Sequence, residues 1–311
     1  MDEKLRNRSR SVICFVRKYK FSVLFLLMVC WGLFGSMQTT NTTFFIRQMM
    51  IMTFLTIGVA LEYISGDFDL AFVAQISASS LICVFLIQKG VPISISCIVV
   101  LIFNGLAGCL KSIMIIQMHM PSVIVTLGLQ MILVNLCSGF TKNSNIIIPS
   151  LRVEYRQLYL NVAEVLLLII GVAAAVYFLN QTYYGKYARM LGENLTLARK
   201  NGMECTKISM IIHVWASLFF SVPVMFLVLY TGSGSSTLGS DYLYKVFAAV
   251  FLGRILFRKQ GWFVSGMVMG ALAVVVFVGV LTARGYLNQW ETIIEGVIIL
   301  LALWRGEHKK V

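Results

Sequence analysis

Three carboxylates lie close together where two long apolar runs meet, a setting in which acidic side chains are rare. Glu62 lies inside the first run, and Asp67 and Asp69 lie in the short stretch before the second. A carboxylate at the centre of a membrane helix costs roughly 2.5–3.5 kcal/mol on insertion scales, so it is expected to avoid lipid and to line a solute, proton or ion path. The alternative is a tight turn, because Ser65 and Gly66 favour turns and Asp69 is suited to capping the next helix.

Four neutral hydrogen-bonding side chains lie well inside other apolar runs: Asn104, Thr126, Gln130 and Asn135. Thr126 and Gln130 are four residues apart and therefore share one face of a helix. Such groups suit a neutral polyhydroxylated solute. They equally suit hydrogen bonds between helices, which contribute about 0.6–2 kcal/mol per pair. Together with Glu62, Asp67 and Asp69 they form the predicted solute pathway.

Signatures of catalysis and of metal binding are absent from the sequence. Gly185-Lys186 is followed by Tyr187 and lacks the upstream glycine of a P-loop, so the chain is not expected to bind ATP in that way. The seven cysteines contain no C-x-x-C pair, and the three histidines form no H-E-x-x-H pattern. The sequence therefore predicts neither an enzyme nor a metal or cofactor site, and an integral-membrane enzyme is the weakest alternative.

Composition places the chain in a membrane. Of its 311 residues, 59% are hydrophobic and 13% are charged, whereas an average soluble protein carries about 25% charged residues. Continuous apolar runs of membrane-spanning length predict an all-α polytopic integral membrane protein of about ten transmembrane helices. The predicted spans are 21–37, 45–64, 70–88, 92–117, 122–139, 161–180, 209–231, 241–253, 262–283 and 290–304.

The formal net charge is +13, and the basic residues flank the predicted spans. This distribution is typical of membrane topology rather than of nucleic-acid binding. The N-terminal segment 1–20, the loop 181–208 and the tail 305–311 contain seven, five and three Lys or Arg residues. Placing these three in the cytoplasm agrees with ten crossings by a permease domain over residues 21–304. Both termini are then cytoplasmic, in a multi-pass protein.

The two halves of the chain have a possible internal relationship. Spans two to five and spans seven to ten have opposite orientations in this topology, which is the inverted-repeat arrangement of many transporters. The eighth span (241–253) is short enough to be broken or re-entrant.

The loop 181–208 contains a candidate docking element. Asn194 is suited to capping a short helix that runs to about Lys200, and Gly202 is suited to ending it in the left-handed conformation. One face of this helix is apolar, and Arg199 and Lys200 charge the rest. An amphipathic helix of this kind either docks in the groove of a soluble partner or lies flat at the lipid headgroups.

Five segments resemble the motifs of one family, in the same order. Residues 64–70 (I-S-G-D-F-D-L) resemble V/I-S-G-G-I-D-L-S, and residues 121–128 (P-S-V-I-V-T-L-G) resemble P-F-I-x-T-L-G. Residues 192–203 (G-E-N-L-T-L-A-R-K-N-G-M) resemble the coupling segment G-x-N-x-x-A-A-R-x-x-G-I. Residues 248–253 resemble A-A-V-V-L-G, and 266–271 resemble the following G-x-x-x-G-A. The family is that of the inner-membrane permeases of bacterial ABC importers for ribose and related monosaccharides, including autoinducer-2 permeases.

This resemblance covers residues 45–304 and implies a complex. The family's complexes contain two permease subunits, identical or different, two cytoplasmic ABC ATPases that bind the ATP, and an extracytoplasmic solute-binding protein. It implies that the chain lies in the bacterial inner membrane among its lipids and translocates a monosaccharide or related small polar solute. The residues implied to contact the ATPase are Gly192, Glu193, Asn194, Ala198, Arg199 and Gly202.

Two departures from the family pattern stand out. The glycine-rich turn that usually follows A-A-V-V-L-G is replaced by the basic residues 254–261, and the second glycine of S-G-G is replaced by Asp67. Two other transporter classes stay open at this point. One is an ion-coupled secondary transporter that uses Glu62 and Asp69 as its ion site. The other is a branched-chain amino acid permease, a sister within the ABC importers.

Overall fold

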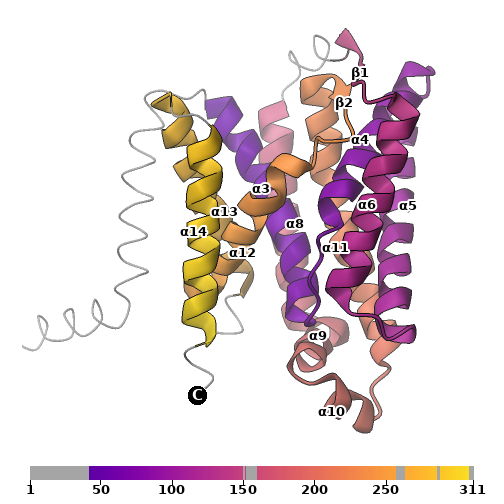
Figure 1. The fold of residues 1–311 in the computed structure, drawn as a ribbon, viewed down its shortest axis with the longest axis vertical. Helices are drawn as coiled ribbons and strands as arrows, with labels where there is room; N and C mark the ends of the chain where they lie inside the picture. The colour runs from indigo at the N-terminus through magenta and orange to yellow at the C-terminus, as the bar shows by residue number, and fades with distance from the viewer. Residues whose placement is uncertain (1–41, 150, 152–159, 257–262, 286–287, 308–311) are drawn as a thin grey trace, which may run out of the picture.

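A computed structural model describes residues 42–149, 151, 160–256, 263–285 and 288–307. The described chain is almost wholly helical and forms one bundle, with two short strands at one end (Figure 1). The prediction of an all-α polytopic membrane protein is confirmed in this coarse form. The basic N-terminus and the predicted first span lie outside the described residues.

The helices of the bundle coincide with every predicted span after residue 41. In chain order they are α3 (Thr42–Ile64), α4 (Phe72–Gln88), α5 (Ile93–Ser112), α6 (Ser122–Thr141), α8 (Leu160–Gln181), α11 (Cys205–Thr231), α12 (Leu243–Leu256), α13 (Phe263–Ala283) and α14 (Asn288–Glu307). The shorter elements are β1 (Ile146–Ile147), α9 (Tyr183–Glu193), α10 (Leu195–Lys200), β2 (Ser233–Gly234), η2 (Ser240–Tyr242) and η1 (Ile113–Gln117), a π-helical turn that continues α5. Within the described ranges, six helices are long and apolar enough to cross a membrane.

The centre of the bundle is the pair α3 and α11, which pack against each other. α11 also packs against α4 and α5, and α3 packs against α8, α12 and α13. Aromatic rings join three of these helices in the core: the Phe72 centroid lies 5.7 Å from that of Phe220 and 6.1 Å from that of Phe247. The core therefore closes around the first turn of α4, and this fixes the position of the segment that precedes α4.

The chain is extended between α3 and α4, over residues 65–71. It turns sharply at Gly66, which has φ +92°, a value that favours glycine. The Asp69 carboxylate then accepts a 2.7 Å hydrogen bond from the Ala71 N–H, just ahead of α4. The predicted turn at Ser65-Gly66 is present. Asp69 does not cap α4 as expected, because the N-cap residue is Ala71 and no side chain caps the helix; Asp69 instead stabilises the turn just before it. The break brings acidic side chains into the interior.

A second irregular segment, residues 232–242, joins α11 to α12. It leaves α11 at Gly232, pairs β2 with β1, and then runs beside α4. The Gly239 N–H donates to the Ser77 hydroxyl at 3.0 Å, and a Cβ at Gly239 would collide with the Val73 carbonyl oxygen. α12 begins only after this segment and has 14 residues, which agrees with the short, interrupted eighth span expected from the sequence.

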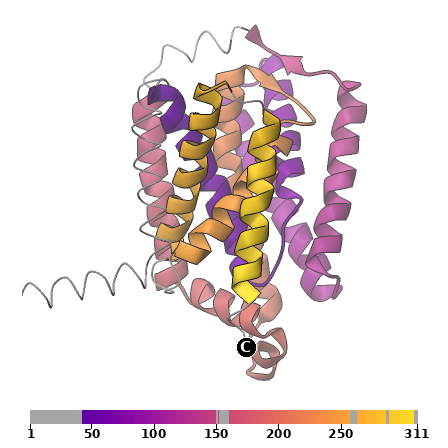
Figure 2. The same ribbon diagram turned by 60° about the vertical axis from the view of Figure 1, so that its left-hand side comes forward.

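The loop 181–208 forms two helices at the end of the bundle opposite β1 and β2 (Figures 1 and 2). The sequence predicted only the second of them. α9 begins at a threonine cap, in which the Thr182 hydroxyl accepts from the Gly185 N–H at 3.1 Å. α10 follows the prediction: the Asn194 side chain accepts from the Leu197 N–H at 3.0 Å, and Gly202 has φ +74°.

Candidate functional site

A buried lysine brings together two of the predicted acidic residues. The Lys111 Nζ lies 2.7 Å from Glu62 Oε1 and 2.6 Å from Asp69 Oδ2, and all three side chains are buried. Glu62 comes from the last turns of α3, Asp69 from the extended segment, and Lys111 from the last turn of α5. We call these three residues the Lys111 cluster. Charge-assisted bonds of this length are strong, and they fix the break between α3 and α4 to α5.

The third predicted carboxylate lies beside this cluster. Asp67 Oδ2 is 3.6 Å from His213 Nε2 of α11 and 3.5 Å from the Ser65 hydroxyl. Burial raises the pKa of Asp67 to about 7, and the hydrogen bond from Ser65 partly opposes that rise. The other ring nitrogen of His213 bonds the Ser209 carbonyl oxygen at 2.9 Å, which orients the imidazole toward Asp67.

Of the four neutral polar residues of the predicted pathway, only Thr126 forms a hydrogen bond with the segment that contains Asp67 and Asp69, within the part of the chain that the structure describes. Thr126 of α6 donates to the Phe68 carbonyl oxygen at 3.1 Å, so it attaches α6 to the extended segment. Asn104 of α5 donates to the Ser79 hydroxyl of α4 at 2.8 Å, a bond between helices. Gln130 is half-buried on α6, and the exposed Asn135 donates to a carbonyl of its own helix. The structure thus gathers Glu62, Asp67, Asp69 and Thr126 around one segment.

Sequence reasoning missed Lys111 and His213. A lysine inside the apolar run 92–117 is itself a signal, because a cation at that depth needs a partner. The sequence therefore contained a signal for Lys111, but its partners Asp69 and Glu62 are 42 and 49 residues away in the chain.

The segment that resembles a coupling motif touches the break directly. Gly192, the penultimate residue of α9, packs on the backbone of residues 64–66. A Cβ there would collide with the Ile64 carbonyl oxygen and lie 2.9 Å from the Gly66 nitrogen. Glu193 and Asn194 are exposed, and Ala198 is buried on the inner side of α10. The end of α9 therefore rests on the acidic break with no side chain in between.

A second contact runs from α10 to the end of α5. Arg199 Nη1 lies 3.2 Å from His119 Nε2, and Nη2 donates to the Ile116 carbonyl oxygen at 3.4 Å. Ile116 belongs to the π-helical turn η1, and His119 follows it with φ 56°, which is uncommon for a residue other than glycine. π-Helical turns are often found at functional positions. Arg199, predicted only as a surface charge, therefore also holds α10 against the end of α5.

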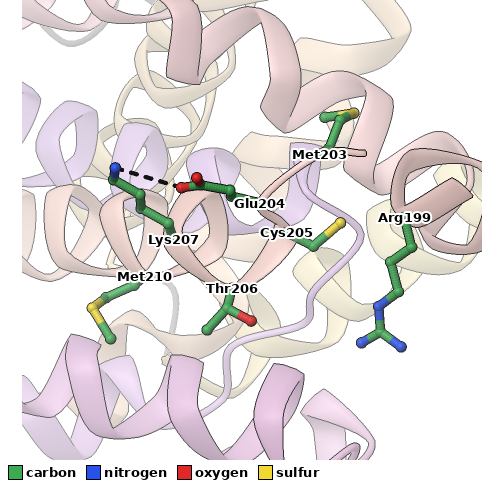
Figure 3. A pocket seen from close by; sticks show the side chains of 7 residues that line it. All are labelled: Arg199, Met203, Glu204, Cys205, Thr206, Lys207 and Met210. Atoms are coloured by element: carbon green, nitrogen blue, oxygen red, sulfur yellow. Dashed lines mark ion pairs between the residues drawn. The ribbon is translucent and has the colours of Figure 1, made fainter. Parts of the chain in front are cut away.

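An open pocket of about 520 Å³ lies where α10 passes into α11 (Figure 3). Glu204 and Lys207 form an exposed ion pair of 3.5 Å at its rim. Its lining residues are Arg199, Met203, Glu204, Cys205, Thr206, Lys207 and Met210. These residues lie in α10, in the start of α11 and in the turn between them. In the part of the chain that the structure describes, no group of three His, Cys, Asp or Glu side chains is placed to hold a metal.

Residues 41–303 match the family described as the permease component of branched-chain amino acid transport systems. The chain is 23% identical over 303 residues to the autoinducer 2 import system permease protein LsrD of Yersinia enterocolitica, with 92% of this chain and 90% of the relative covered. It is 27% identical over 299 residues to the fructose import permease protein FrcC of Rhizobium meliloti, with 90% and 82% covered.

A third relative is the galactose/methyl galactoside import permease protein MglC of Haemophilus influenzae, 22% identical over 317 residues with 91% and 92% covered. No solved structure matches the chain significantly. The family match spans most of the chain, and it includes the acidic break, the π-helical turn and the α9–α10 segment. The chain therefore belongs to the family of permease components of branched-chain amino acid transport systems.

Proposed function

We propose that this chain is the membrane-spanning subunit of an ATP-driven importer of the bacterial inner membrane. It takes a monosaccharide or related small polar solute from an extracytoplasmic binding protein. The named relatives are import permeases for autoinducer 2, fructose and galactosides. The observation that carries the proposal is the capped helix α10, which lies outside the bundle and follows α9, whose Gly192 packs on the backbone of residues 64–66 at the acidic break. An ion-coupled secondary transporter and a membrane enzyme are not favoured by these relatives.

The proposed orientation places α9 and α10 in the cytoplasm together with both termini. Five Lys or Arg residues in the loop 181–208 support this side as the cytoplasmic one. Ten spans are proposed, with the first in residues 21–37 and the permease domain over 21–304. The segments 1–20 and 305–311 are then cytoplasmic tails.

An inverted repeat is proposed for α3–α6 and α11–α14. The packing partners are reciprocal: α3 packs on α13 as α11 packs on α5, and α3 packs on α12 as α11 packs on α4. α4 lies against α5 and α6, just as α12 lies against α13 and α14. In both units a long helix is followed by an irregular segment and then a short helix. Because α3 and α11 start from opposite ends of the bundle, the two units have opposite orientations.

The coupling segment, residues 192–202, is proposed to receive movement from a cytoplasmic ABC ATPase, which binds the ATP. Its contact residues are Gly192, Glu193, Asn194, Ala198, Arg199 and Gly202. Closure of the ATPase would press on α10 and shift the end of α9, which lies on the backbone of residues 64–66. A second permease subunit, identical or different, would complete the pathway. Glu62, Asp67, Asp69, Asn104, Thr126, Gln130 and Asn135 are proposed to border that pathway or to hold the helices that do.

Disrupting α10 without disturbing the bundle tests this function. In Gly202→Pro the proline cannot adopt φ +74° and removes the N–H that donates to the Arg199 carbonyl oxygen. We expect ATP-dependent uptake into vesicles to fall by about tenfold or more, because a misplacement of about 1 Å is enough for a loss of this size. The amount of folded protein in the membrane should stay the same.

The matched control is Thr196→Ala, an exposed position on the same helix. This variant should transport at the wild-type rate. Normal uptake by Gly202→Pro would refute the coupling role of α10. Uptake that continues without the ATPase, and collapses when a protonophore is added, would instead establish a secondary transporter.

A further inference from the structure

The second irregular segment carries polar groups deep into the bundle. Gly239 lies against Val73 in the first turn of α4, whereas Gly234 of β2 lies against Ser80 and α4 ends at Gln88. Fifteen helical residues separate these two positions, which places Gly239 about 22 Å along α4 from its outer end. The hydrocarbon core of a bilayer is about 30 Å thick. The segment therefore reaches well inside the membrane before α12 begins.

Several side chains at this depth are exposed on the chain taken alone. Thr237, Ser240 and Asp241 of the irregular segment are exposed, and Tyr244 at the start of α12 is 50% exposed. Irregular backbone and a carboxylate cannot face lipid, because nothing in the hydrocarbon would satisfy their hydrogen bonds. This face must meet either water or another protein surface.

A second buried ionic group lies beside the same turn. Lys245 Nζ of α12 is 2.7 Å from Glu291 Oε1 of α14, and Glu295 lies one turn further along α14. The Lys245 side chain is 25% exposed, whereas Glu295 is 2% exposed. Among the residues that the structure describes, Glu295 Oε1 has no hydrogen-bond partner. We call Lys245, Glu291 and Glu295 the Lys245 cluster. It offers one cation and two carboxylates, of which Glu291 is paired with Lys245.

We propose that the Lys245 cluster and the exposed turn before α12 form a solute-binding subsite on a water-filled path, for a polyhydroxylated solute. This inference rests on the proposed function and adds residues to it that the sequence analysis did not identify. Carboxylate oxygens accept hydrogen bonds from sugar hydroxyls, and the Lys245 ammonium donates to them. An interrupted transmembrane helix is where transporters commonly place such a site.

The contrast with the Lys111 cluster supports this assignment. All three side chains of the Lys111 cluster are buried, and the ammonium bonds both carboxylates within 2.7 Å. Each cluster has a carboxylate oxygen without a hydrogen-bond partner among the described residues, Glu62 Oε2 in the first and Glu295 Oε1 in the second. The difference lies in access: the Lys111 cluster is sealed, whereas the Lys245 side chain is 25% exposed. The first cluster therefore holds the fold, and the second can be reached by a ligand.

Two measurements on the intact importer, prepared with its own ATPase and binding protein, test the subsite. The first labels Thr237→Cys and Ser240→Cys in sealed membranes with a membrane-impermeant methanethiosulfonate, above the background of the wild-type chain. We expect both cysteines to react. Ile132→Cys, on the exposed apolar face of α6, is the control and should stay unlabelled. No reaction at positions 237 and 240 would show that lipid or protein covers this face, and would overturn the proposal.

The second measurement compares Glu295→Gln and Glu295→Asp in proteoliposomes loaded with ATP, with fructose and galactose as the probes. We expect Glu295→Gln to lower uptake by about tenfold or more while ATP hydrolysis and complex assembly persist, because only the hydrogen-bonding carboxylate is lost. Glu295→Asp should recover part of the rate. Wild-type uptake by Glu295→Gln would overturn the subsite. If the wild type itself shows no ATP-dependent uptake, the proposed function fails. The labelling result still decides whether water reaches the turn before α12.

Discussion

Replacing Lys111 by methionine is expected to lower the free energy of unfolding by about 3–5 kcal/mol, because it leaves two buried carboxylates without their cation. Glu62 and Asp69 both bond this one ammonium, at 2.7 and 2.6 Å. The loss would be read as a fall in the thermal unfolding temperature of the detergent-solubilised protein and as a smaller folded yield.

The matched control removes the whole cluster at once. In the triple variant Lys111→Met, Glu62→Gln, Asp69→Asn no uncompensated charge remains, and most of the lost stability should return. Removing a complete buried ion pair is often close to neutral, whereas removing one partner is not. If the single variant Lys111→Met is as stable as the wild type, the contacts of Lys111 with Glu62 and Asp69 do not contribute the expected free energy of unfolding.

The second large effect is expected at the contact between α9 and the acidic break. In Gly192→Val the new Cβ would collide with the Ile64 carbonyl oxygen, which belongs to backbone and cannot rotate away. The end of α9 must therefore move off residues 64–66. We expect ATP-dependent uptake to fall by about tenfold or more while ATP hydrolysis continues, because a displacement of about 1 Å far from a reacting centre is enough for such a loss.

Gly105→Ala is the control for this substitution, because a Cβ at Gly105 meets no atom of the described residues within 4 Å. It should transport as the wild type does. If Gly192→Val transports normally, movement of α9 does not reach the pathway through this contact. If it loses both ATP hydrolysis and uptake, the contact serves assembly rather than coupling.

Much of the fold was accessible from the sequence. Apolar run length located every described helix of the bundle, because the thickness of a bilayer fixes that length. The caps of α10 were also predicted in detail, since Asn194 and Gly202 act on backbone groups within three residues of themselves. Sequence rules for helix ends are sufficient where the hydrogen bond that decides the structure joins residues a few positions apart.

The pairing of side chains across the bundle was not accessible in this way. Run length does not say which helix faces meet, so Lys111 was not linked to Glu62 and Asp69. The Lys245 cluster was missed for the same reason, since its members come from residues 245, 291 and 295. The separate helix α9 escaped notice because it is too polar for a span and has only a threonine cap at its start.

The candidate site was located in part. Glu62, Asp67 and Asp69 do gather at one break, as their spacing suggested, but the structure satisfies two of them internally. Asn135 is exposed and bonds only its own helix among the contacts described, so its part in the pathway stays a prediction. A polar residue in an apolar run indicates an interaction, and only the packing of the helices decides whether its partner is solute or protein.

The central claim is that this chain works as one subunit of a complex driven by a separate ATPase. The most direct test is affinity purification of the tagged chain from its native membranes in mild detergent, with mass spectrometry of the proteins that accompany it. The account predicts a P-loop ATPase in stable proportion to the chain, and much less of it with the Gly202→Pro variant. Repeated recovery of the chain without any ATPase, in a detergent shown to preserve complexes of this class, would contradict the account.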